Sequence, residues 1–193
     1  MIKKLRYLKY YAKVLLNNWT ASKDSYAQHG EDKLVELLLP KGVHSFIDIG
    51  ANDGVLFSNT YKFAKCGARG LCIEPSRNSY NKLRLNHIFN PKVKCLHGAV
   101  SNFEGSIYLK DKGYESTLST VSKTKSIGSK KVCCRTFSSI LKDYPSFNKI
   151  DFLSIDVEGH EDKVIEGLER TPFITKIIVI ESDKSEIEKL LSI

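Results

Sequence analysis

The sequence predicts an α/β protein with a doubly wound, mostly parallel sheet. Short apolar runs with the period of strands alternate along the chain with segments that have the period of helices. Acidic residues stand at or just after the ends of four predicted strands, at Asp48, Glu74, Asp156 and Glu181. In such folds ligands bind beyond the carboxyl ends of the strands. Four acids at one edge of the sheet therefore predict a functional edge.

The elements follow from local patterns. Residues 1–20 are a predicted basic amphipathic helix, followed by a single domain over residues 21–193. Strands are expected at 45–49, 70–74, within 93–100, and at 107–109, 132–136, 151–155 and 176–180, with 107–109 and 132–136 forming a hairpin. Helices are expected at 31–39, 55–65, from Ser76 onward, and at 137–142, 160–168 and 184–191.

Two of these helices have an apolar stripe that is expected to face the sheet. In the helix at 31–39 the stripe is Leu34, Leu37 and Leu38. In the helix at 55–65 it is Phe57, Tyr61 and Ala64, and Gly67 is suited to end that helix.

Composition limits the class of protein. A chain of 193 residues with 41% hydrophobic residues is long enough for one well-buried core. It has no run of roughly 18 to 20 apolar residues that could cross a bilayer. The cysteine number, five, is odd and the spacing C-x-x-C is absent, which is typical of unpaired thiols in a reducing compartment. These features predict a cytoplasmic protein.

The net charge of +8 is unevenly distributed. Basic residues concentrate in the first thirteen positions and in the polar stretch from 116 to 131, whereas residues 138–193 are acidic on balance. This asymmetry suits an anionic partner such as a membrane surface, an acidic glycan or nucleic acid, although solvated surface lysines explain the second cluster equally well. Lys9 and Lys13 interrupt the apolar face of the N-terminal helix, which argues against a secretory signal. That helix is expected to lie on a membrane, on the body of the protein or on a second subunit.

The segment from Phe46 to Gly54 is typical of a nucleoside-binding turn. A buried strand ends in Gly50-Ala-Asn-Asp-Gly54, and the next strand ends at Glu74, where such folds place an acid to accept hydrogen bonds from ribose. Asp53 in the loop would repel a pyrophosphate but suits a ligand with an ammonium and a sulfonium group, and Asp48 adds a second negative charge. Charge matching thus favours S-adenosylmethionine over a dinucleotide. The alternative is that Asp48 and Asp53 cap the helix that follows.

A second motif runs from Ser154 to Glu161. Asp156 leaves the predicted strand, Gly159 lets the chain turn, and His160 opens the next helix. An acid and an imidazole at this spacing can deprotonate an acceptor hydroxyl or help to bind a divalent ion. Alternatively, the acids favour the positive end of the helix and His160 caps it.

Four blocks of this chain resemble those of the FkbM-type S-adenosylmethionine-dependent methyltransferases. They are Ser25-Tyr-Ala-Gln-His-Gly-Glu-Asp32, Phe46 to Gly54, Ile73-Glu-Pro75 and Ile155-Asp-Val-Glu-Gly-His-Glu161, and the first and last are the most specific. The resemblance covers roughly residues 25–182. It implies a Rossmann-like class I methyltransferase fold and methyl transfer to oxygen, often on sugars, glycoconjugates or other hydroxylated metabolites.

The resemblance also implies roles for individual residues. The cofactor would contact Gln28, Glu31, Asp32, Asp48, Gly50, Asn52, Gly54, Glu74, Pro75, Ala99, Val100 and Ser101. Candidates for a general base are Asp156, His160 and Glu181, and no metal site is expected. The polar stretch from 113 to 131 would be a lid or an acceptor-recognition loop.

The sequence departs from the family pattern at its end. Folds of this class usually continue with a strand pair after the strand at 176–180, whereas a short helix is expected here. An uncovered strand edge favours association, so a homodimer is one expectation. Two alternatives to an O-methyltransferase stay open: a non-catalytic cofactor-binding or regulatory remnant, and a nucleic-acid methyltransferase, against which speaks the lack of an Asn/Asp-Pro-Pro-Tyr/Phe tetrapeptide.

Overall fold

A computed structural model describes residues 24–110, 120–122, 127–157 and 159–181. The helices predicted at 1–20 and 184–191 and most of the polar stretch at 113–131 lie outside the described residues.

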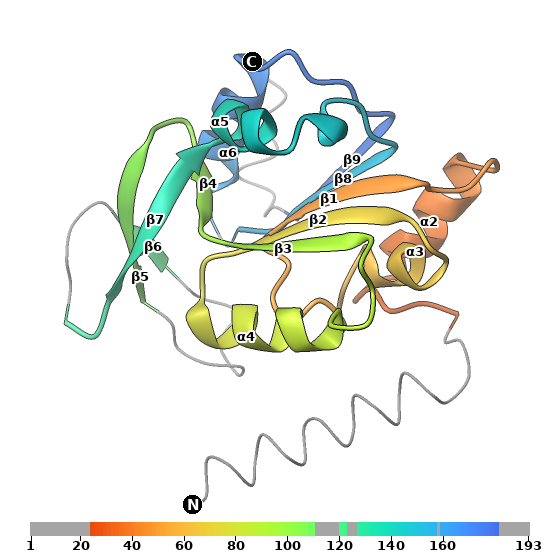
Figure 1. The fold of residues 1–193 in the computed structure, drawn as a ribbon, viewed down its shortest axis with the longest axis horizontal. Coiled ribbons are helices and arrows are strands. Elements are labelled where there is room, and N and C mark those ends of the chain that lie inside the picture. The colour runs from red at the N-terminus through yellow and green to blue at the C-terminus, as the bar shows by residue number, and fades with distance from the viewer. Residues whose placement is uncertain (1–23, 111–119, 123–126, 158, 182–193) are drawn as a thin grey trace, which may run out of the picture.

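The centre of the molecule is a five-stranded sheet in which all neighbouring strands are parallel (Figure 1). The strand order is β3-β2-β1-β8-β9. The strands are β1 (Ser45–Ile49), β2 (Arg69–Glu74), β3 (Val93–His97), β8 (Phe152–Ile155) and β9 (Ile177–Ile180). β1 is central and each of its five residues is buried, because helices cover both faces of the sheet. The predicted doubly wound, mostly parallel sheet is confirmed.

The two faces of the sheet have separate apolar cores. One face packs against α5 (Phe137–Asp143) and α6 (Glu161–Glu169), with Ile47, Phe137 and Val164 fully buried between them. The opposite face packs against α2 (Glu31–Leu38), α3 (Tyr61–Lys65) and α4 (Arg77–Asn86), and its core includes Phe46. Alternate residues of β1 therefore point into different cores, as expected for a strand with helices on both sides.

A second, smaller sheet of four strands has the order β4-β7-β5-β6. It comprises β4 (Ala99–Ser101), β5 (Gly105–Lys110), β6 (Thr120–Ser122) and β7 (Lys130–Thr136), and the predicted hairpin between β5 and β7 is confirmed. The third strand predicted within 93–100 is confirmed as β3, and a separate strand, β4, follows it because the chain passes at Gly98 from one sheet to the other. The Gly98 amide donates to the carbonyl of Glu74, which is the last hydrogen bond from β3 to β2 before the chain enters β4.

The prediction of a buried leucine stripe on α2 is wrong. Leu34, Leu37 and Leu38 are each more than half exposed, whereas Val35 and Asp32 are fully buried. The Asp32 carboxylate accepts hydrogen bonds from the Ser25 hydroxyl and the Tyr26 amide, which turns this side of the helix inward. A buried polar contact thus decides the rotation of the helix and leaves three leucines outside.

The helix predicted over 55–65 is shorter than expected, because only Tyr61–Lys65 is helical. The amides of Val55 and Leu56 donate to the Asp53 carboxylate, and Phe57 has a positive φ of 56° and forms a bridge with Ala27. These contacts hold the segment before Thr60 in a loop. Gly67, with φ 88°, follows the end of α3 as predicted.

No helix within the described ranges is long and apolar enough to cross a bilayer. All five cysteines lie in those ranges, and none of them forms a disulfide.

The close packing of Gly70 in β2 against Phe46 in β1 can be tested by substitution. A β-carbon on Gly70 would stand 2.2 Å from the ring of Phe46, which is fully buried. We expect Gly70→Ala to lower the free energy of unfolding by about 1–3 kcal/mol through overpacking, measured by urea denaturation. The double variant Gly70→Ala/Phe46→Leu has room for the added methyl, so it should be more stable than the sum of the two single effects predicts. Strict additivity would contradict this contact.

Candidate active site

The loops after β1, β2 and β8 meet at the carboxyl edge of the central sheet. The amides of Gly50 and Ala51 donate to the carbonyl of Ile73 at the end of β2, at 2.9 and 3.1 Å. The Asp156 amide donates to the carbonyl of Ile49 at 2.9 Å. These three bonds fix the turn after β1 between its two neighbouring strands.

Two glycines of this turn are required by the packing of the protein itself. A β-carbon on Gly50 (φ 90°) would stand 1.7 Å from the carbonyl oxygen of Asp156, and one on Gly54 (φ 75°) would stand 2.4 Å from the Leu83 side chain. Gly54 also lies against His87, whose pKa burial lowers to about 4. The packing of the protein itself therefore excludes a β-carbon at both positions, which the sequence alone did not indicate.

Glu74 is buried at the end of β2, and both of its carboxylate oxygens accept backbone hydrogen bonds. Oε2 accepts from the Asn52 amide at 2.9 Å, and Oε1 accepts from the Ser76 amide at 2.6 Å. Asn52 itself has a positive φ of 50° and is exposed. These two bonds hold the carboxylate of Glu74 in a fixed orientation at the end of β2. Pro75 follows, half-buried, and its carbonyl lies 3.1 Å from Nε2 of His97.

Asp48 lies inside the protein rather than at the open edge. It is 4% exposed, and its carboxylate accepts a hydrogen bond from the Thr60 hydroxyl at 2.6 Å. Burial raises the pKa of Asp48 to about 6, against the opposing effect of hydrogen bonds from Thr60 and Ser154. The charge of this group is therefore partly suppressed near neutral pH.

Asp53 is buried as well, and its carboxylate organises the loop. It accepts the amides of Val55 and Leu56 at 2.9 and 2.8 Å. One alternative from the sequence was that Asp53 caps the helix that follows. Its carboxylate does bind the backbone just after it, but no helix begins there. The carboxylate of Asp53, whose charge was expected to repel a pyrophosphate, is therefore not exposed to solvent.

The block from Ser25 to Asp32 packs next to the turn after β1. Gln28 is exposed, Glu31 accepts a hydrogen bond from the His29 amide, and Asp32 is held inside by Ser25 and Tyr26. Of these three predicted cofactor contacts, the structure leaves the side chain of Gln28 most accessible.

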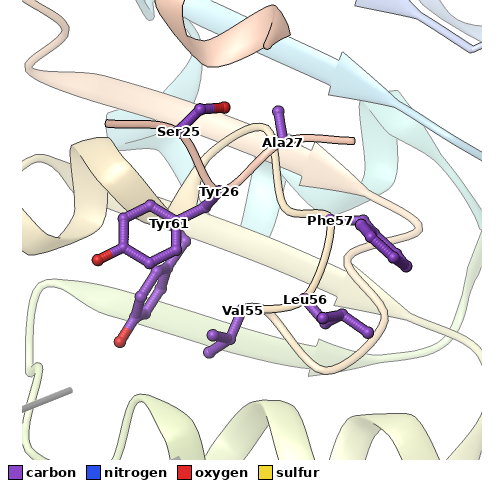
Figure 2. A pocket seen from close by; sticks show the side chains of 7 residues that line it. All are labelled: Ser25, Tyr26, Ala27, Val55, Leu56, Phe57 and Tyr61. Carbon is purple, nitrogen blue, oxygen red and sulfur yellow. The ribbon is translucent and has the colours of Figure 1, made fainter. Parts of the chain in front are cut away.

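Between this block and the loop after Gly54 lies a hollow of about 190 Å³ (Figure 2). Its walls are Ser25, Tyr26, Ala27, Val55, Leu56, Phe57 and Tyr61. Ligand pockets usually measure roughly 300–1,000 Å³, so this hollow is large enough for part of a cofactor only. The lining residues at 55–61 were predicted to lie in a helix, and Ser25, Tyr26 and Ala27 entered the prediction only through the family resemblance.

The motif after β8 brings the second set of predicted residues to the same edge. Asp156 is half-buried directly after the strand, and Nε2 of His160 lies 3.0 Å from the Ser101 hydroxyl of β4. Glu181 follows β9 and is exposed, with its amide bonded to the carbonyl of Ile155. The structure therefore places His160 against Ser101, while Ala99 and Val100 are buried in β4.

Glu161 is a residue of this edge to which the sequence analysis gave only a helix-capping role. It is 2% exposed, and its Oε1 accepts the amides of Val157 and Gly159 at 3.1 and 3.2 Å. Among the described residues none hydrogen-bonds its Oε2. Its position directly after Gly159-His160 was the available signal, since an acid in the first helical turn often binds loop amides. Glu161 thus shapes the loop that carries Asp156 and His160.

In the part of the chain that the structure describes, no group of three His, Cys, Asp or Glu side chains could hold a metal ion. The parallel sheet, the glycine turn after β1 and the acid after β2 together define a Rossmann-like α/β protein with its site at the carboxyl edge.

A family model described as the methyltransferase FkbM domain matches residues 48–192. The chain therefore belongs to the FkbM methyltransferase family.

Two solved structures illustrate the likeness. The methyltransferase FkbM from Methylobacillus flagellatus KT has 16% identity and a TM-score of 0.42, over 66% of this chain and 29% of that chain. This chain therefore spans less than a third of that structure. Precorrin-6y C5,15-methyltransferase from Geobacter metallireducens GS-15 has 14% identity and a TM-score of 0.50, over 90% of this chain and 72% of that chain, and this likeness shows the fold alone. A search of curated proteins found no match.

The raised pKa of Asp48 predicts how stability depends on pH. The folded protein binds this proton more tightly than the unfolded chain, so stability should fall as the pH rises from about 4 to about 6. Asp48→Asn keeps an oxygen that can accept the Thr60 hydrogen bond and removes the buried charge. We expect this variant to lose that part of the pH dependence and to be more stable than wild type at neutral pH, by up to about 3 kcal/mol. Chemical denaturation across this pH range measures both effects, and parallel profiles for the two proteins would contradict them.

Proposed function

We propose that this chain is an S-adenosylmethionine-dependent methyltransferase that methylates a hydroxyl oxygen of a sugar, a glycoconjugate or a similar small metabolite. The observation that carries the proposal is Glu74, whose carboxylate is held by the amides of Asn52 and Ser76 at the carboxyl edge of a sheet in a member of the FkbM family.

The residues at this edge fit such a cofactor. A carboxylate that is fixed by two backbone amides is arranged to accept hydrogen bonds from the two hydroxyls of a ribose. The turn at Gly50 and Asn52 supplies backbone next to it, and Gln28 would approach from the side of the N-terminal block. S-adenosylmethionine would supply a methyl group on a positively charged sulfur. Asp48 and Asp53 would contribute to the shape of the turn rather than to direct contact, because both are buried.

The acceptor hydroxyl would be held and deprotonated by the loop after β8. His160 is oriented by its contact with the Ser101 hydroxyl, and Asp156 lies four residues before it on the same loop. Glu161 would keep this loop in place through Val157 and Gly159. Orientation of the acceptor is expected to contribute more than the base, because well-oriented reactions gain roughly 7–11 kcal/mol while general bases add about two to four orders of magnitude in rate.

The cofactor is tested by isothermal titration calorimetry with S-adenosylmethionine, its demethylated product and NAD. We expect binding of the first two in the micromolar range. Glu74→Ala should weaken it at least about tenfold, because hydrogen bonds to a charged group contribute about 1.5–3 kcal/mol. Glu169→Gln, which changes an exposed acid at the end of α6, is the matched control and should bind like wild type. Tight binding of NAD in place of the methyl donor would overturn the proposal.

The acceptor is tested by transfer of a labelled methyl group to the carbohydrate fraction of a cell extract, with mass spectrometry of the product. Asp156→Asn and His160→Gln should lower the turnover rate by about two to four orders of magnitude if each acts in proton removal, while the affinity for the methyl donor changes little. Full turnover in both variants would exclude them as bases. Donor binding without labelled product from any fraction would assign the chain to the cofactor-binding modules that lack activity. Label in nucleic acid would assign it to the nucleic-acid methyltransferases.

A further inference from the structure

Several large apolar side chains are exposed together on the outer face of the layer formed by α2, α3 and α4. Three leucines of α2 point outward, and Leu37 is 76% exposed. At the end of α4, Leu85 and Ile88 are exposed together with Phe89, which is 89% exposed. Single exposed apolar residues are common on soluble proteins, whereas neighbouring groups of large ones usually mark a contact.

The three helices form one continuous layer. The Lys62 ammonium of α3 is paired with Glu36 of α2 at 2.5 Å, and the Asn90 side chain after α4 donates to the carbonyl of Ala64 in α3. Each of these helices leads directly into a parallel strand, so all three end at the amino edge of the sheet (Figure 1). The apolar groups of α2 and α4 therefore share one side of the molecule, opposite the edge with the candidate active site.

The same part of the chain holds the excess positive charge. Residues 1–94 contain sixteen basic and seven acidic side chains, whereas residues 95–193 contain fourteen basic and fifteen acidic ones. None of the ten basic side chains in residues 24–94 is buried, but four of the seven acids are, namely Asp32, Asp48, Asp53 and Glu74. The surface of this layer is therefore more basic than the sequence indicates.

Helix ends account for only part of this pattern. Lys65 and Arg84 lie in the last turns of α3 and α4, where a cation is favoured by the helix dipole. Lys41 and Lys92 lie in the connections to β1 and β3, beyond the helices, and both are exposed. The dipole also gives no reason for the exposed leucines and Phe89. Apolar side chains flanked by cations are the combination that binds the surface of an anionic bilayer.

The positive charge of this face disfavours two of the partners that could cover it. A second copy would bring the same basic face against itself, and like charges would repel. Residues 1–23 contain six basic side chains and no acidic one, so they repel it as well. At the first described residue, Asp24 is paired with Lys33 of α2 at 3.7 Å, which offsets only one of the cations of this layer.

We propose that the outer face of the α2–α3–α4 layer docks on a membrane that contains anionic phospholipids. The leucines of α2 and the residues at the end of α4 enter the interface between headgroups and acyl chains, and the surrounding cations meet the lipid phosphates. Because this face lies at the amino edge, the carboxyl edge with Glu74 and Asp156 remains open to solution.

The test is co-sedimentation of the full chain with vesicles of phosphatidylcholine mixed with phosphatidylglycerol, and with vesicles of phosphatidylcholine alone. We expect binding to the anionic vesicles that weakens with added salt. Leu37→Ser/Phe89→Ser should weaken it by about tenfold or more, because two large apolar side chains no longer enter the interface. Ile127→Ser is the matched control and should bind like wild type, since Ile127 is 98% exposed but lies in the connection before β7.

Four results would overturn the proposal. Equal binding of wild type and the double variant would assign all lipid affinity to other parts of the chain, and equal binding to neutral vesicles would remove the role of the cations. A dimer in light scattering that the double substitution dissociates would assign the face to a second copy. If the double substitution lowers the melting temperature of the monomer by several degrees without changing vesicle binding, the face is covered by residues 1–23.

Discussion

The candidate site depends on the close approach of two loops at Gly50. The carbonyl oxygen of Asp156 occupies the place where any other residue at position 50 would put its β-carbon. The same turn is bonded to Ile73 on one side, and Ile49 just before it is bonded to the Asp156 amide on the other, so β1, β2 and β8 share one junction. Glu74 and Asp156 belong to different strands, and this junction holds their backbones at a fixed spacing. A side chain at position 50 would therefore separate Glu74 from the loop that carries Asp156.

Buried carboxylates serve a different purpose from those at the edge. Asp32, Asp53 and Glu161 each accept two hydrogen bonds from the segments beside them, mostly from backbone amides that would otherwise be left without partners in the interior. Asp48 is bonded to side chains and is partly neutralised by burial. The negative charge available to a ligand is therefore smaller than the number of acids suggests, and it is concentrated at the ends of the strands. This distribution agrees with a site that positions its ligands by hydrogen bonds more than by net charge.

The sequence predicted the elements whose signals are local and missed features that depend on tertiary contacts. Apolar runs such as Phe46-Ile47 and Leu71-Cys72-Ile73 identified the parallel strands, because strands buried on both faces consist of little else. The side chain of Ser76 accepts the Ser79 amide at the start of α4, as its position predicted. The rotation of α2 could not be predicted, since the leucine stripe was the stronger periodic signal and the buried bonds of Asp32 were invisible. Likewise, nothing local showed that Gly98 would lead the chain into another sheet.

At the candidate site, the sequence identified Glu74 and His160 as residues of the carboxyl edge. It did not identify the hollow around Tyr26 and Phe57, because that hollow is formed by two segments that are distant in the chain.

The second sheet is inserted into the α/β body between β3 and α5. β4 and β7 pair in parallel, with Ser101 opposite Thr136, so the chain leaves and returns at neighbouring points. Val100 and Phe137 anchor the two ends in the main core, and Glu104 bonds to Thr136 across the gap between them. The described residues 102–110 and 127–133 thus extend from a base that is fixed at both ends in the main core. A change in the length or composition of this part of the chain would leave the strand register of the central sheet intact.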